Sequence, residues 1–104
     1  MPTTVAIRRR GWAVEYVDDV REASCAMGYH EDHELDGKCF PQERLILVDS
    51  EIQGRALLET EIHELIHARE PDWHENRVTP LAREIAAALW RLGWRAAPRT
   101  ATSG

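Results

Sequence analysis

The feature that most constrains the fold is the run His63-Glu64-Leu65-Ile66-His67, in which two histidines stand four residues apart. If this run is helical, the two imidazole rings lie one turn apart, about 6 Å along the axis and roughly 40° around it. Both rings can then reach one metal ion, and zinc accepts neutral imidazole nitrogen readily. The run therefore predicts a helix that supplies two ligands of a zinc site.

The glutamate inside this run has a different expected role. Glu64 follows His63 directly, so on a helix it is turned by about 100° from that histidine and flanks the metal. From there it can accept a proton from a water molecule that the metal makes acidic. We therefore expect Glu64 to act as a general base and His63 and His67 as zinc ligands.

The neighbouring residues favour a helix around the motif. Leu58, Ile62, Leu65 and Ile66 form one apolar stripe, while the two histidines fall on the other side. We expect this helix over about residues 53–69. Its predicted N-cap is Asp49 or Ser50, with Gln53 in the capping-box position, and Pro71 ends it.

Several shorter segments precede the helix. Residues 4–8 and 12–17 predict a hairpin with Gly11 in its turn, and residues 18–24 fit either a loop or a short helix. Residues 25–43 show no period and predict a long loop, which in a compact domain is usually functional or disordered. The aliphatic run 44–48 is the clearest strand signal in the chain.

A second helical pattern follows the motif. Its apolar stripe should pack on the motif helix or on the sheet, and consists of Leu81, Ile85, Ala88, Leu89 and Leu92. Asp72 with Glu75 forms a capping box that favours a start near residue 73, whereas Thr79-Pro80 favours a later start; a short first helix with a kink at Pro80 would satisfy both. Gly93 fits the position just after the helix end.

The predicted fold is therefore α+β: a short antiparallel sheet packed on the motif helix, plus a C-terminal helix. At 104 residues the chain fits one small domain, which we expect over residues 1–94, with residues 95–104 forming a disordered tail.

A catalytic zinc needs a third protein ligand. Glu70 is about 10 Å along the helix axis from His63, which is too far. If the next helix runs antiparallel after Pro71, Glu75 comes level with His67. His74 and Glu84 remain alternatives, as does a residue of the 25–43 loop. A capping role would also explain Glu75 without any metal.

Composition limits the remaining possibilities. The net charge of −5 gives no strong signal for nucleic-acid binding, and the arginines at positions 8–10 are read as a solvated edge. No apolar run is long enough to span a membrane and no secretory signal is visible, so we expect a cytoplasmic protein. Cys25 and Cys39 are expected as free thiols, the alternatives being a disulfide or a second zinc site with His30 and His33.

The stretch from Leu57 to Ala68, then Pro71-Asp72 and Glu75, then Leu89 to Trp94, resembles the minimal zincin-like metallopeptidases encoded in phages and prophages. More distantly it is similar to the SprT-like and ImmA/IrrE-like zincins. The resemblance covers roughly residues 44–95. It implies a small sheet packed on the motif helix, and zinc held by two histidines. In zincins of the glutamate type the third ligand is a glutamate on a following helix, which by position is Glu75. The interval from His67 to Glu75 is shorter than in most larger families of that type.

These observations lead to two functional hypotheses. The first is a zinc-dependent peptidase acting on a peptide or protein substrate, in which strand 44–48, if it forms a sheet edge, holds the substrate by strand addition. Tyr29, His33 and Arg77 are its candidate oxyanion donors. The second is a non-catalytic zinc-binding interaction or regulatory module of phage or prophage origin. A pair of helices without metal is a third reading. The sequence defines neither the substrate nor the oligomeric state.

Overall fold

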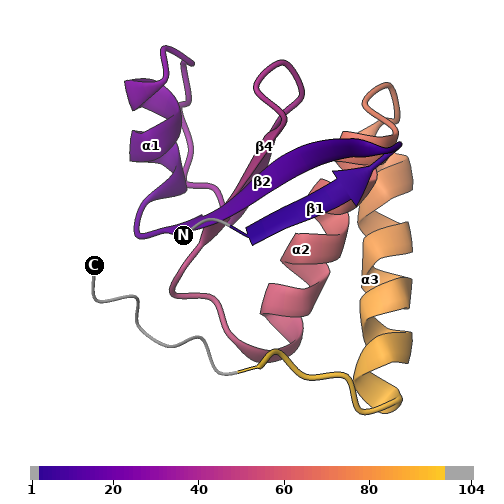
Figure 1. Ribbon diagram of the computed structural model, residues 1–104. Helices are drawn as coiled ribbons and strands as arrows, with labels where there is room; N and C mark the ends of the chain where they lie inside the picture. Colours follow the sequence, from indigo (N-terminus) through magenta and orange to yellow (C-terminus); the bar gives the residue numbers. More distant parts are fainter. Residues whose placement is uncertain (1–2, 98–104) are drawn as a thin grey trace.

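The structure is a computed structural model that describes residues 3–97. Its elements in chain order are β1 (Thr3–Ile7), β2 (Arg10–Val17), α1 (Val20–Ala26), β3 (Gly37–Phe40), β4 (Leu45–Asp49), α2 (Gly54–Arg69) and α3 (Glu75–Arg91). Figure 1 shows α1 on one side of the sheet and α2 on the other, with α3 packed against α2. The predicted α+β class is confirmed.

The sheet is mixed, so the predicted antiparallel sheet is wrong at its centre. Its strand order is β1-β2-β4-β3, with antiparallel pairs at both edges and a parallel pair between β2 and β4. Parallel neighbours need a long crossover connection. The segment between Val17 and Leu45, which contains α1 and β3, provides it.

The N-terminal hairpin was predicted, but its turn is elsewhere. Ile7 pairs with Arg10, so the two-residue turn is Arg8-Arg9, and Gly11 lies within β2. Both turn residues have positive φ angles, 50° and 66°. Such turns need left-handed backbone at both positions, for which glycine or asparagine is the usual choice. Two arginines occupy these positions here. The prediction that Gly11 forms the turn was wrong, because it relied on the usual preference for glycine.

The predicted 25–43 loop contains a strand that the sequence did not indicate. β3 pairs with β4, and its Phe40 is buried against Val20 and Leu47. Only four residues long and beginning Gly-Lys, β3 is too short and too polar to show an alternating pattern. Residues 18–24, left open between loop and helix, contain most of α1, which Asp19 caps by accepting from the backbone N–H of Glu22.

The core has two parts, one on each face of the sheet. On one face, Ile46 and Val48 of β4 pack with β2 residues and with Leu57 and Ala68 of α2. On the other face, Leu47 packs with Val20 and Phe40. Because β4 is buried on both faces, its sequence is a continuous aliphatic run, as central strands require.

The motif helix has the predicted extent, but its N-cap residue is not the predicted one. Gln53 is the N-cap residue of α2 and makes no side-chain cap bond, so the predicted capping box is wrong. Ser50 instead donates to Asp18, and the carboxylate of Asp49 accepts from the backbone N–H of Glu51. The helix ends at Arg69, before Pro71 as predicted.

α3 is a single helix from Glu75, with Pro80 inside it and His74 as N-cap residue. Of the two predicted starts of this helix, the one near residue 73 is closer to the observed start than the one at Pro80. At its other end Gly93 has φ 95°, its N–H bonds to Trp90 O, and Trp94 N–H bonds to Leu89 O. This pair of bonds is the predicted glycine-terminated helix end.

The face of α3 that is buried is shifted from the predicted stripe. Val78, Ala82 and Ala86 are fully buried, whereas Ala88 and Leu92 are exposed. The alanines stand one turn apart and let the two helices approach closely. A pattern based on the large apolar residues missed this face, because two of its three fully buried residues are alanines.

Two further observations complete the fold. No helix within residues 3–97 is long and apolar enough to cross a membrane. The predicted tail, 95–104, is described only as far as residue 97, and positions 98–104 lie outside the described residues. Arg95 stacks on Trp90, with its guanidinium carbon 3.4 Å from the centroid of the Trp90 ring. It also donates hydrogen bonds to the backbone carbonyl oxygens of Trp90 and Trp94.

Ala82→Leu should destabilise the protein by about 1–3 kcal/mol, because the added atoms have no room between α2 and α3. The matched substitution Ala88→Leu, on the exposed face of the same helix, should change the free energy of unfolding by less than about 0.5 kcal/mol. Urea denaturation measures both. Equal stability of the two variants would contradict the close helix contact.

Candidate metal centre

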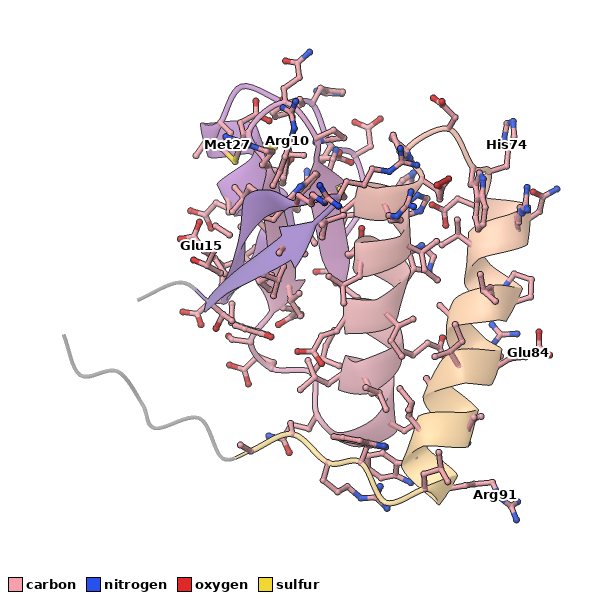
Figure 2. All side chains as sticks on the ribbon, turned by 45° about the vertical axis from the view of Figure 1, so that its right-hand side comes forward. Arg10, Glu15, Met27, His74, Glu84 and Arg91 are labelled. Atoms are coloured by element: carbon pink, nitrogen blue, oxygen red, sulfur yellow. The ribbon has the colours of Figure 1, made fainter. Side chains whose placement is uncertain are left out.

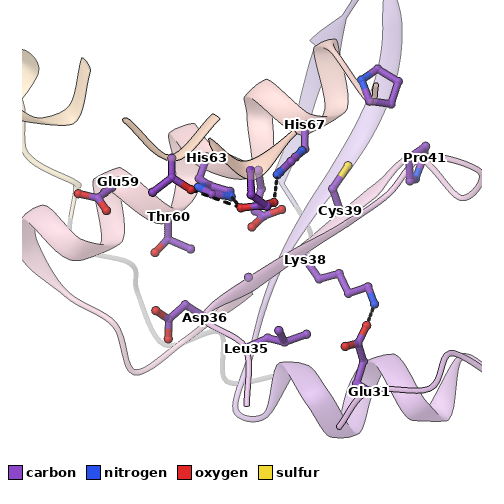
Figure 3. Close-up of a pocket in the computed structure, with 15 residues that line it drawn as sticks. Glu31, Leu35, Asp36, Lys38, Cys39, Pro41, Glu59, Thr60, His63 and His67 are labelled. Carbon is purple, nitrogen blue, oxygen red and sulfur yellow. Dashed lines mark hydrogen bonds and ion pairs between the residues drawn. The ribbon is translucent and has the colours of Figure 1, made fainter. Parts of the chain in front are cut away.

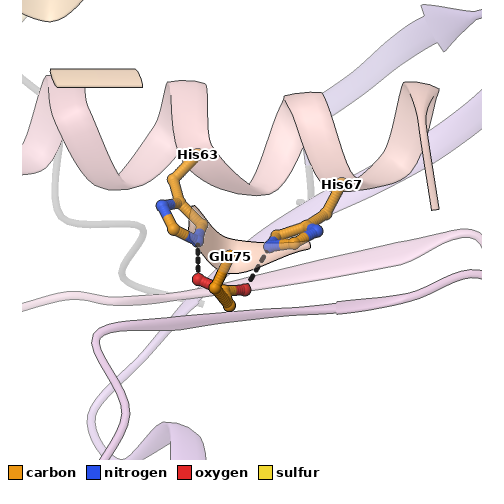
Figure 4. Close-up of side chains that lie close together, drawn as sticks. All are labelled: His63, His67 and Glu75. Atoms are coloured by element: carbon orange, nitrogen blue, oxygen red, sulfur yellow. Dashed lines mark hydrogen bonds and ion pairs between the residues drawn. The ribbon is translucent and has the colours of Figure 1, made fainter. Parts of the chain in front are cut away.

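Three side chains from two helices meet at one point between α2 and α3. Glu75 Oε2 lies 2.9 Å from His63 Nε2, and Glu75 Oε1 lies 2.5 Å from His67 Nε2. Figure 4 shows both rings of α2 turned toward the one carboxylate. One donor atom from each residue lies within 4.8 Å of the other two, so the group could hold a metal ion.

The chain path explains why these residues meet. His63 and His67 lie on successive turns of α2, and their ring centroids are 4.9 Å apart. α2 ends at Arg69, and α3 begins at Glu75 after a short reversal. The second helix therefore returns antiparallel to the first, and its first residue faces the last turn of α2. An antiparallel return of this kind was the assumption from which the sequence analysis predicted Glu75 to be level with His67.

The other proposed third ligands lie elsewhere. His74 and Glu84 are exposed on α3, and in Figure 2 both side chains point away from α2. His30 pairs with Asp32 at 2.8 Å and is not part of the cluster. Within residues 3–97, no other group of three histidine, cysteine or acidic side chains converges as these three do.

Glu64 lies beside the cluster and outside it, as the helical spacing predicted. Its side chain is buried, with 7% exposed, under the edge strand β3. Gly37 makes this possible: a Cβ there would lie 3.0 Å from Cγ of Glu64 and 3.0 Å from Cγ2 of Thr60. Among the described residues no hydrogen bond or ion pair engages the Glu64 carboxylate.

The two carboxylates of the site have opposite pKa shifts. Burial, together with the negative charge of Glu75, raises the pKa of Glu64 to about 8, although the Lys38 ammonium opposes this. Burial alone would raise the pKa of Glu75 as well, but the two histidines outweigh it and lower that pKa. A divalent cation at the cluster would lower the pKa of Glu64, because positive charge favours the carboxylate.

The cluster opens into a cleft of about 600 Å³. One wall is formed by β3 and the segment before it, and the other by α2 and the start of α3. Figure 3 shows His63 and His67 in the middle of the cleft, Asp36 and Glu59 toward one end, and Pro41 toward the other. The cleft is therefore a groove along the sheet edge that passes the candidate metal ligands.

Several cleft residues were not singled out from the sequence, namely Asp36, Gly37, Lys38 and Glu59. For the three loop residues the only sequence signal is the Asp-Gly pair within an otherwise featureless loop, whereas Glu59 lies one helical turn before His63 on the predicted motif helix. None of the three predicted oxyanion donors lines the cleft. Tyr29 donates a hydrogen bond to Glu43, and His33 is exposed. The guanidinium carbon of Arg77 lies 3.7 Å from the ring centroid of Trp73. Thr79 does line the cleft, and donates to Glu75 Oε2 at 3.4 Å.

The two cysteines are free and differ in environment. Cys25 is exposed on α1, whereas Cys39 is half-buried on β3 and lines the cleft. Burial and the nearby charge of Glu64 raise the pKa of Cys39 to about 12. Among the described residues these cysteines form neither the disulfide nor the second zinc cluster that the sequence left open.

Comparisons with protein-family models, with curated proteins and with solved structures find no match to this chain. The resemblance to minimal zincin-like peptidases therefore depends on the residues quoted above, and the functional argument on the geometry of the site.

Cys39 should react with iodoacetamide far more slowly than Cys25 at pH 8. Only the thiolate is nucleophilic, and a pKa of about 12 leaves roughly one Cys39 in ten thousand ionised at that pH. The variants Cys25→Ser and Cys39→Ser isolate each thiol for mass spectrometry. In urea the two should react at similar rates. A native Cys39 as reactive as Cys25 would contradict the buried position of β3 against α2.

Proposed function

We propose that this chain is a zinc-dependent peptidase, with zinc held by His63, His67 and Glu75 and with Glu64 as general base. The observation that carries the proposal is the convergence of three donor atoms within 4.8 Å of one another inside an open cleft. A buried carboxylate without a partner stands immediately beside them.

The donor set suits zinc. Two imidazole nitrogens and one carboxylate oxygen are the ligands of one common class of catalytic zinc site. The Nε2 atoms of both histidines already face the carboxylate that would share the metal with them. Binding requires lone pairs on both nitrogens, so each ring would carry its proton on Nδ1 when the metal is held.

The number of ligands favours catalysis over a purely structural site. Structural zinc sites are closed by four protein ligands, whereas catalytic sites keep a position open for water. Within residues 3–97 the cluster offers three donor residues, and His74 and the loop histidines lie outside it. An open position facing the cleft follows from this count.

The mechanism assigns a separate task to each group. Zinc, when bound, would supply the Lewis acidity that polarises the scissile carbonyl and makes water acidic. Glu64 would accept the proton of the attacking water and then deliver it to the leaving amine nitrogen. Its position under β3, buried and held off the ligand face, fits a proton acceptor whose pKa is tuned by its surroundings.

The substrate would lie along β3. The sequence assigned strand addition to residues 44–48, but β4 is an interior strand with β2 on one side and β3 on the other. β3 is the edge strand next to α2, and its second edge has no strand partner among the described residues. An extended peptide could pair with this edge while its carbonyl approaches the metal ligands.

The free thiols fit a reducing compartment, and on that basis we propose a cytoplasmic protein. The minimal phage-encoded zincins remain the class that the motif resembles. The competing function is a non-catalytic zinc-binding module of phage or prophage origin; in that case the metal would stabilise the fold and nothing would be cleaved.

The purified protein should bind about one zinc per chain, and His63→Ala and His67→Ala should lose it. Glu75→Ala should weaken zinc binding by at least about tenfold, since even residues that only support a ligand contribute that much. Glu84→Ala, on the same helix but outside the cluster, is the matched control. Metal analysis and competition with a chelator measure these affinities. Unchanged zinc binding in the three ligand variants would contradict the metal centre.

Glu64→Gln should retain the fold and the zinc, yet lose hydrolysis by a factor of roughly a hundred to ten thousand. Glutamine has nearly the same shape but cannot accept the proton. The assay is digestion of unfolded proteins by the zinc-loaded chain, with cleavage followed by mass spectrometry. If the wild type cleaves nothing, the non-catalytic module is favoured. If wild type and Glu64→Gln cleave equally, the proposed mechanism is wrong.

A further inference from the structure

The two ends of the cleft differ in charge. Asp36 and Glu59 line one end, while Pro41 lies at the other, as Figure 3 shows. Of the other cleft carboxylates, Glu31 pairs with Lys38 and Glu75 contacts both histidines, while Glu64 is buried beside α2's histidines. Asp36 and Glu59 make no side-chain hydrogen bond or ion pair with any described residue. Negative charge is therefore left uncompensated at one end.

The acidic pair is close to the proposed reaction centre. Glu59 stands four residues before His63, one turn away on the same face of α2. Asp36 directly precedes Gly37, whose backbone approaches Thr60 and Glu64. The carbonyl oxygen of Asp36 accepts a 2.8 Å hydrogen bond from Asp49 N–H, which fixes the backbone from which this carboxylate projects.

An independent observation indicates that a ligand enters this cleft. Glu64 lines it, is 93% buried, and has no hydrogen-bond or ion-pair partner among the described residues. Buried polar side chains normally have a hydrogen-bond partner. A group that binds in the cleft next to Glu64 would supply the missing partner.

The acidic end suits a cationic side chain better than a second metal ion. Within residues 3–97 it offers only two carboxylates and no third donor that converges with them. An ammonium or guanidinium group needs no more than one or two carboxylates. Leu35 also lines the cleft beside Asp36, as Figure 3 shows, and offers apolar surface for the stem of a lysine or arginine.

We propose that Asp36 and Glu59 form a substrate subsite for a lysine or arginine side chain, on one side of the scissile bond only. This inference rests on the proposed peptidase function and adds the substrate class. Toward the other end Figure 3 shows Pro41, Cys39 and the ion pair of Lys38 with Glu31. The charges of that pair compensate each other, so the preference is one-sided.

The test begins with a cleavage site mapped in an unfolded protein. Peptides spanning this site carry a single lysine, glutamine or glutamate at each of three positions on either side. For the zinc-loaded wild type we expect lysine to exceed glutamine in kcat/KM by on the order of tenfold on one side, and glutamate to fall below glutamine there. On the other side the three peptides should be equivalent. Equivalence on both sides would overturn the proposal.

The double variant Asp36→Asn/Glu59→Gln should abolish the preference through a higher KM for the lysine peptides. Glu51→Gln/Glu84→Gln removes the same charge from exposed positions outside the cleft and should retain the preference. A preference that survives in the first variant, or disappears equally in both, would contradict a local subsite.

Peptide binding to zinc-loaded Glu64→Gln, measured by fluorescence polarisation, separates this inference from the proposed function. Tighter binding of lysine peptides without cleavage by the wild type would support the subsite and contradict the peptidase. Cleavage without any charge preference would support the peptidase and contradict the subsite. If no peptide is bound or cleaved, both proposals are wrong.

Discussion

The contact of Glu75 with His63 and His67 is the interaction on which the proposed site depends. It joins the first residue of α3 to the last two turns of α2, so it exists only if the helices run antiparallel and pack closely. Ala82 and Ala86 allow that close packing. Without bound metal, the carboxylate contacts both imidazole rings directly. With metal, the same three side chains would share one ion, so the geometry that stabilises the helix pair also prepares the site.

The sheet provides the second half of the site. β4 is buried on both faces and holds β3 in antiparallel register at the edge beside α2. Gly37 lets the β3 backbone approach Glu64 so closely that this side chain is largely buried, and burial is the main cause of its raised pKa. In the proposed site, α2 supplies Glu64 and two of the metal ligands, α3 supplies Glu75, and β3 forms the wall of the cleft. Their relative positions depend on the packing of α2 against both β3 and α3.

Local signals in the sequence were sufficient for part of this arrangement. The motif helix, the helix end at Gly93 and the central strand all have patterns confined to a few neighbouring residues, and each was predicted. Glu75 could be placed because only five residues separate the two helices, which leaves little freedom in the reversal. The parallel pairing of β2 with β4 is non-local, and no pattern within either strand distinguishes it from antiparallel pairing. β3 is too short to show a period, so the cleft wall and its charges became visible only in the fold.

The most direct test of the account is a crystal structure of the zinc-bound protein. The account predicts one zinc coordinated by Nε2 of His63, Nε2 of His67 and the carboxylate of Glu75, at about 2.0–2.2 Å, with water in the remaining position and Glu64 within hydrogen-bond distance of that water. Zinc closed by a fourth protein ligand, or zinc bound away from these residues, would contradict it.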